Sequence, residues 1–120
     1  MIARIQWNTW SKEAFVESQK KNKPVLLALS AVWCHWCHVM DETTYSDQDS
    51  IELIMREVIP VRVDIDEHPE IKERYHLGGF PTTVFLNADG KIISGGTYLP
   101  PVEFKHLLKR ACADFDNQKQ

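Results

Sequence analysis

Apolar and polar positions follow one another along the chain in patterns that predict strands separated by helices. Residues 25–30 (VLLALS) form an uninterrupted apolar run of strand length, which is typical of a central strand covered on both faces. Residues 61–66 alternate between apolar and charged side chains and predict a strand with one buried face. Residues 82–86 and 91–94, joined by the turn sequence NADG, predict a hairpin. A short edge strand is expected at residues 4–7.

Helical periodicity and capping residues fill the intervals between these strands. Ser11 is a good N-cap for a first helix that ends near residue 21, just before a proline. A second helix is expected over residues 34–42. Ser46 with Asp49 three positions later resembles a capping box, which predicts that a third helix begins there.

Proline and glycine mark the limits of the remaining helices. Pro60 is expected to break the third helix, and a fourth is expected over residues 70–77 with Gly78 at its C′ position. Pro100 or Pro101 opens the last helix. Its apolar stripe consists of Phe104, Leu107, Leu108, Ala111 and Phe115.

The order of these elements predicts an α/β protein with a mixed sheet flanked by helices on both faces. Residues 1–120 contain neither a repeat nor a linker, so we expect one domain, with an N-terminal extension at residues 1–10 and a frayed tail at 116–120. A chain of 120 residues buries roughly two-thirds of its unfolded surface, so no metal or set of disulfides is needed for folding.

Charge and hydropathy exclude two classes of partner. The net charge is −3 and no basic run is present, which argues against a nucleic-acid-binding protein. No apolar run approaches the roughly 20 residues that a membrane-spanning helix needs. The first 13 residues, MIARIQWNTWSKE, lack the apolar segment of a signal peptide. We therefore expect a cytoplasmic protein that acts as a monomer.

The densest chemistry lies in the stretch WCHWCH, residues 33–38, which fits three kinds of site. Cys34 and Cys37 form a C-x-x-C redox pair, and with His38 they also fit the attachment signature of c-type haem. Two cysteines with two histidines could also supply most of a zinc site. The haem interpretation needs export, an axial ligand and an apolar crevice. The zinc interpretation needs four ligands, and neither a second C-x-x-C nor an H-x₃₋₅-H follows.

A cysteine at the start of a helix faces unsatisfied N–H groups and the positive end of the helix dipole. Such a position can lower a cysteine pKa from about 8.5 to between about 3.5 and 7.5. Cys34 is therefore the expected nucleophile, and Cys37, one turn later, is the expected resolving thiol. His35 either stabilises the thiolate as a cation or is merely exposed. Trp33 and Trp36 are expected to form apolar surface where a partner polypeptide docks, with ordinary core packing as the alternative.

The sequence GGFPTT, residues 78–83, lies between a predicted helix and a predicted strand, where Pro81 is a candidate for a cis peptide bond. Together with the blocks WCxxC and VDID, it resembles the thioredoxin superfamily over about residues 23–113. Within that superfamily, SAxWCHWCHVM and GGTYLPP are similar to the YyaL-like and spermatogenesis-associated thioredoxin-domain proteins. Residues 43–66 are also similar to the C-terminal domain of the disulfide reductase DsbD.

The resemblance implies a thioredoxin fold with a four- or five-stranded mixed sheet. It implies substrate binding at Phe80, Pro81 and Thr82, where the Phe80 backbone pairs with an extended substrate chain. It also implies thiol–disulfide exchange on protein substrates, with an upstream electron donor and no cofactor beyond the cysteine pair. The reducing direction is expected in the cytoplasm. Two alternatives are an oxidase or isomerase, favoured by His35, and a protein-binding module whose cysteines are incidental.

One departure from the resemblance concerns proton transfer. Thioredoxins carry a buried aspartate six residues before the first cysteine, and that position here is Ala28. His38 and Glu42 are the candidates to take the proton of the resolving thiol, along with water. The third cysteine, Cys112, borders the apolar stripe of the last helix and is expected to be a buried structural thiol.

Overall fold

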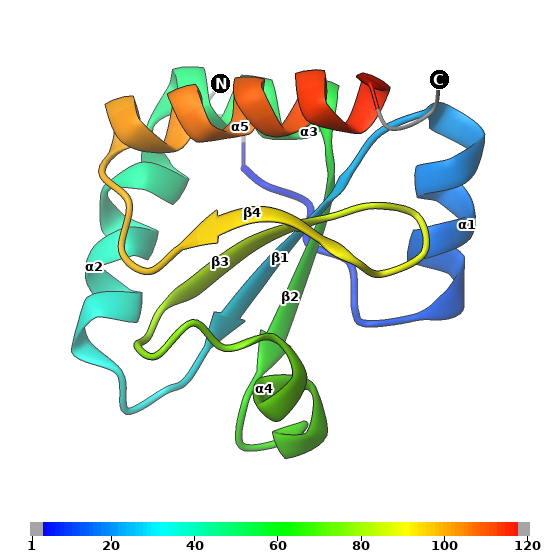
Figure 1. Cartoon of the computed structure of the whole chain (residues 1–120). Coiled ribbons are helices and arrows are strands. Elements are labelled where there is room, and N and C mark those ends of the chain that lie inside the picture. The colour runs from blue at the N-terminus through cyan, green and yellow to red at the C-terminus, as the bar shows by residue number, and fades with distance from the viewer. Residues whose placement is uncertain (1–3, 118–120) are drawn as a thin grey trace.

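A computed structural model shows four strands in one mixed sheet covered by helices, and it describes residues 4–117 (Figure 1). The sheet order is β2-β1-β3-β4, with β1 and β2 parallel and the other neighbours antiparallel. The strands are β1 (Val25–Ser30), β2 (Ile59–Asp64), β3 (Thr82–Leu86) and β4 (Ile92–Gly96). The helices are α1 (Lys12–Lys21), α2 (His35–Glu42), the 3₁₀ turn η1 (Thr44–Ser46), α3 (Gln48–Glu57), α4 (Pro69–Tyr75) and α5 (Pro101–Asn117).

The two faces of β1 bury separate cores, because successive side chains of a strand point in opposite directions. Val25, Leu27 and Leu29 pack with residues of α1 and α4, whereas Leu26 packs with residues of α2, α3 and α5. The first five residues of this strand are buried, which confirms its prediction as a central strand. The predicted α/β class, the mixed sheet and the helices on both faces are likewise confirmed.

The first helix begins as predicted. The Ser11 side chain accepts a hydrogen bond from the Ala14 amide at 3.3 Å, and Trp10 packs edge-on against Phe15 with ring centroids 5.1 Å apart. The predicted edge strand at residues 4–7 is wrong. Only Asn8 pairs with the sheet, through a single parallel bridge to Val61 on the outer edge of β2.

The predicted capping box of the third helix is also wrong. The N-cap of α3 is Asp47, whose carboxylate accepts hydrogen bonds from the amide and hydroxyl of Ser50 at 3.0 and 2.8 Å. The helix ends at Glu57, and Pro60 lies inside β2 instead of separating the two elements. Proline is tolerated there because its nitrogen faces the outer edge of the sheet, where the Pro60 carbonyl accepts from Asn8.

The later boundaries shift by a few residues. α4 ends at Tyr75 with His76 as its C-cap, so the prediction of Gly78 as a C′ residue is wrong. Gly78 instead has φ +94° within the loop before β3. α5 continues to Asn117, so residues 116 and 117 belong to the helix, and the rest of the predicted tail lies outside the described residues. No helix within residues 4–117 is long and apolar enough to cross a bilayer.

We predict that Asp47→Ala lowers the free energy of unfolding at pH 7 by about 1 kcal/mol, because it removes the N-cap of α3. The hydrogen bond from Ser50 holds the pKa of the Asp47 carboxyl below its usual value. Its stabilisation is therefore present above the unfolded-state pKa and is lost as the pH falls through the folded-state pKa. Urea unfolding at several pH values measures both effects. Asp49→Ala, on the same helix, is the control and should cost less.

Candidate active site

The redox pair lies where β1 ends and α2 begins. Cys34 is the N-cap of α2, and Cys37 follows in its first turn. Their Cα atoms are 5.3 Å apart, within the usual range for a disulfide, and their sulfurs are bonded to each other. The Cys37 amide donates a hydrogen bond to Cys34 Sγ over 3.2 Å. Because this amide is one of the unsatisfied donors of the helix end, it stabilises negative charge on that sulfur.

The loop before α2 is held by its own hydrogen bonds. The Cys34 amide donates to the Ala31 carbonyl at 3.2 Å, and His38 Nε2 donates to the Val32 carbonyl at 2.7 Å. His38 is exposed, so it ties the loop to the helix from the outside. The two cysteines themselves are buried, with 6% of Cys34 and 2% of Cys37 exposed. Cys34 is thus the more exposed of the two residues.

Trp33 forms one aromatic wall beside the dithiol. It is 62% exposed, and its indole nitrogen donates to the Asp66 carboxylate at 2.8 Å. Its ring meets that of Phe80 edge-on, with centroids 6.5 Å apart. The core-packing alternative for Trp33 is wrong, because the side chain lies on the surface and the Asp66 hydrogen bond determines its direction.

Trp36 forms a second aromatic wall with a residue that is distant in sequence. It is 53% exposed, and its ring lies 5.3 Å from that of Tyr98, in the loop between β4 and α5. The Tyr98 hydroxyl is 3.2 Å from the Thr43 hydroxyl at the end of α2. His35 is exposed and packs edge-on against Trp36 at 5.6 Å. Periodicity did not reveal the contact between Trp36 and Tyr98, because 61 residues separate them.

The peptide bond between Phe80 and Pro81 is cis, as the GGFPTT motif predicts. Phe80 packs against the cluster of buried residues that contains both cysteines, so this loop lies beside the redox pair. The Thr82 side chain is fully buried and donates to the Gly79 carbonyl at 2.6 Å. Its hydroxyl therefore stabilises the cis-proline loop from inside and does not face the surface.

An ion pair lies on the face of the sheet that α2 covers. Ala28, at the position of the thioredoxin aspartate, is 4% exposed and adjoins Arg62 of β2 in register. The Arg62 guanidinium donates to both oxygens of Asp41 in α2, at 2.8 Å each, and to Ser30 Oγ at 3.2 Å. The hydrogen bond with Asp41 raises the Arg62 pKa.

Asp41 is a residue of this site that the sequence does not single out. Its position four residues after Cys37 was the only available signal, because that spacing places both on one side of a helix. Glu42, the acid that was considered, is exposed on α2. Among residues 4–117, no group of three or more His, Cys, Asp or Glu side chains is placed to hold a metal ion.

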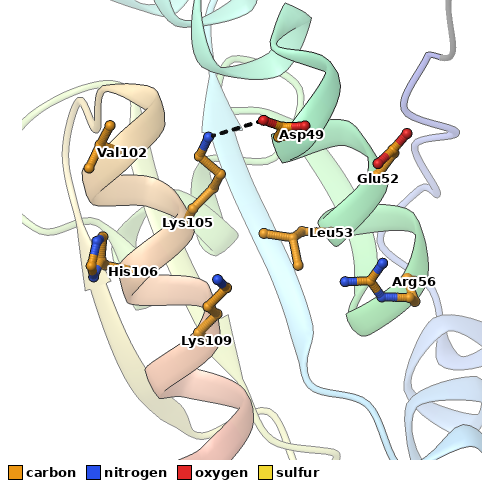
Figure 2. Close-up of a pocket in the computed structure, with 8 residues that line it drawn as sticks. All are labelled: Asp49, Glu52, Leu53, Arg56, Val102, Lys105, His106 and Lys109. Atoms are coloured by element: carbon orange, nitrogen blue, oxygen red, sulfur yellow. Dashed lines mark ion pairs between the residues drawn. The ribbon is translucent and has the colours of Figure 1, made fainter.

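A separate groove of about 480 Å³ lies between α3 and α5 (Figure 2). Asp49, Glu52 and Arg56 line it from α3 and two lysines line it from α5, of which Lys105 pairs with Asp49 at 3.9 Å. The groove shares no residue with the dithiol or the aromatic walls. These charges tie the two helices together on a face remote from the chemistry.

The model of the family Thioredox_DsbH, described as a protein of unknown function, DUF255, matches residues 1–120 of the chain. The chain belongs to this family. The fold of the chain is also that of a solved thioredoxin from Thermus thermophilus, which matches it with a TM-score of 0.82. That structure is 22% identical and covers 98% of this chain and 95% of its own. The predicted resemblance to the thioredoxin superfamily is therefore confirmed.

The chain is similar to parts of several longer proteins from other organisms. Human spermatogenesis-associated protein 20 is 33% identical over 120 residues, which cover 88% of this chain and 15% of that protein. The disulfide bond reductase DsbH of Chlamydia pneumoniae is 28% identical over 74% of this chain and 60% of its own length. The thiol:disulfide interchange protein DsbD of Yersinia pestis is 29% identical over 66% of this chain and 14% of that protein.

These comparisons confirm both narrower resemblances. The chain spans only about a seventh of the length of the spermatogenesis-associated relatives. This thioredoxin-like domain therefore matches only a small part of each spermatogenesis-associated relative.

Cys112 is half-buried in α5, and its Sγ lies 3.8 Å from the Glu57 carbonyl. Burial raises the pKa of its thiol to about 11. We predict that iodoacetamide modifies Cys112 of the oxidised, folded protein at pH 8 about 100-fold more slowly than in denaturant, because the thiolate fraction is that much smaller. Mass spectrometry of the alkylated chain measures both rates. Equal rates in the two states would contradict a buried structural thiol.

Proposed function

We propose that this protein is a thiol–disulfide oxidoreductase that acts on disulfides of polypeptide substrates through Cys34 and Cys37. The observation that carries the proposal is the position of Cys34 at the N-cap of α2, within bonding distance of Cys37 and beside the cis-proline loop. A helix N-terminus, a second thiol one turn later and the backbone of the neighbouring cis-proline loop supply the parts that the exchange reaction needs.

The reaction proceeds in two exchanges. The Cys34 thiolate attacks one sulfur of the substrate disulfide, and the other substrate sulfur leaves as a thiolate. Cys37 then attacks Cys34 Sγ, which forms the intramolecular disulfide and releases the second substrate thiol. The substrate is reduced by two electrons and the protein is oxidised by two. Since the Cys37 amide donates to Cys34 Sγ, the N-terminus of α2 stabilises the attacking thiolate.

The surface around the sulfurs supports a polypeptide substrate. Trp33 and Trp36 present exposed aromatic rings beside the pair, and the half-buried rings of Phe80 and Tyr98 pack against them. Exposed apolar patches of this kind are typical of docking sites. The Phe80 backbone, next to the cis bond, is the proposed partner of an extended substrate chain. The same rings also suit a binding module, in which the sulfurs would have no role.

The proposed direction is reduction, with a separate electron donor that regenerates the dithiol. The relatives DsbH and DsbD are named as a disulfide bond reductase and a thiol:disulfide interchange protein, which supports this direction. A cytoplasmic location, which we also propose, would keep the pair reduced.

Cys37→Ser should leave the nucleophile in place but stop resolution, so we expect it to accumulate a mixed disulfide with a reducible protein such as insulin. Cys34→Ser should neither reduce insulin nor form that adduct. Cys112→Ser is the matched control and should reduce insulin at the wild-type rate. Non-reducing electrophoresis and insulin turbidity measure the outcomes. A Cys34→Ser variant that still reduces insulin would sink the enzymatic proposal.

The equilibrium of the pair with glutathione, followed by tryptophan fluorescence, tests the direction. Trp33 and Trp36 flank the sulfurs, so their emission should change when the disulfide is reduced. We expect a potential near that of thioredoxin, about −270 mV, for a reductase. A value near about −120 mV would instead establish an oxidant. His35→Ala reports whether that side chain contributes to the potential.

A further inference from the structure

The resolving thiol is almost completely enclosed, so its proton has no direct path to bulk water. Cys37 is 2% exposed, whereas the resolution step requires it to lose a proton before it attacks. The neighbouring strand offers no acid, because Ala28 occupies the position below α2 and is itself 4% exposed. An acceptor must therefore come from another element.

Asp41 lies one helical turn after Cys37 in α2. Residues four apart on a helix are neighbours, with Cβ atoms about 5–6 Å apart. Both oxygens of the Asp41 carboxylate accept from Arg62 at 2.8 Å in a bidentate contact. A carboxylate has about four acceptor positions, so two remain for water.

Two hollows bring solvent to this ion pair. One, of about 350 Å³, extends from Arg62 to His38 and the loop that precedes Cys34. The other, of about 680 Å³, is lined by Asp41, Tyr45 and Arg62. Trp7 lines both, with its ring 5.6 Å from the Arg62 guanidinium. The Asp41 side chain is 36% exposed, so a proton that reaches it can pass on to solvent.

We propose that Asp41 accepts, through a bridging water, the proton that Cys37 loses during resolution. The inference rests on the proposed function. The Cys37 S–H proton passes to the Asp41 carboxylate, and the sulfur attacks Cys34 Sγ. The Cys34–substrate S–S bond breaks, the Cys34–Cys37 bond forms, and the substrate sulfur leaves with the electron pair. Asp41 then releases its proton to solvent or to the departing thiolate.

The groups that face Asp41 leave it suited to this role. Arg62 approaches from β2 and pairs with the carboxylate at 2.8 Å. Tyr45 approaches from η1, and burial raises the pKa of its phenol, so it stays neutral in the working range. Arg4 lines the same hollow from the N-terminal segment. On the cysteine side, His38 Nε2 is already hydrogen-bonded to the Val32 carbonyl at 2.7 Å.

The test is single-turnover resolution of the glutathione mixed disulfide, quenched with acid and analysed by mass spectrometry from pH 5 to 10. We expect Asp41→Asn to form the adduct at Cys34 at the wild-type rate but to resolve it roughly 100-fold more slowly at pH 7, the lower range for a positioned base. The two rates should approach each other as the pH rises, because the thiol then loses its proton without help from a carboxylate.

Arg62→Gln breaks the same ion pair but keeps the carboxylate, so it separates chemistry from stability. If the pair only holds α2 on the sheet, both variants should slow resolution equally. If Asp41 is the acceptor, Arg62→Gln should resolve the adduct as fast as the wild type or faster. This variant also decides the matter if Asp41→Asn does not fold, because slow resolution in a folded Arg62→Gln would overturn the proposal.

Glu42→Gln removes the next carboxylate along the helix and should leave the pH profile unchanged. A wild-type profile in Asp41→Asn, or a slow step in Glu42→Gln instead, would overturn the assignment of Asp41. The failure of the proposed function looks different. In that case the wild-type protein itself forms neither the glutathione adduct nor the Cys34–Cys37 disulfide.

Discussion

The hydrogen bond from the Cys37 amide to Cys34 Sγ exists because a buried strand delivers the chain to the first turn of a helix. Both faces of β1 are buried, which fixes the position of this strand in the molecule. The four residues after Ser30 then bring the chain to the N-cap of α2. The sulfur then takes the place of the side-chain oxygen that usually caps a helix. The reactivity of the nucleophile is therefore a consequence of helix geometry, and the strand determines where that helix begins.

The surface around the sulfurs is assembled from loops that each have their own internal support. A carboxylate directs Trp33, the Tyr98 ring directs Trp36, and a buried threonine hydroxyl holds the cis-proline loop. Aromatic side chains on such supported loops present apolar area with little loss of conformational entropy on binding, which suits a site that meets polypeptides.

The ion pair between Asp41 and Arg62 joins α2 to β2 next to Ala28, the position at which thioredoxins carry a buried aspartate. A half-buried arginine requires a counter-ion, since an unpaired charge in that position is costly. With alanine at position 28 on β1, the counter-ion comes from α2 and lies close to the resolving cysteine. Trp7, in the segment before α1, packs its ring against the Arg62 guanidinium. This segment therefore borders the ion pair, although it does not form the expected strand.

Residues that act through local physics could be predicted from the sequence alone. The apolar run of β1, the cap at Ser11, the C-x-x-C spacing and the proline of GGFPTT each depend on neighbours within a few positions, and all four predictions were confirmed. The capping box at Ser46 failed because Asp47 competes for the same role one residue later, with a carboxylate that Ser50 satisfies twice. Pro60 was misjudged because its tolerance depends on which edge of the sheet is free.

Tertiary structure decided the contacts between elements that are far apart in sequence: Trp36 with Tyr98, Trp33 with Asp66, and Arg62 with Asp41. Each joins residues 21 to 62 positions apart whose types are common on any surface, so no periodicity or spacing marks them as partners. The sequence by itself determined the position of the two thiols at the start of a helix, because the C-x-x-C spacing and the apolar strand before it are local features. Only the packing of α2 against β2 decided which acid lies beside them, because that depends on how helix and sheet meet in space.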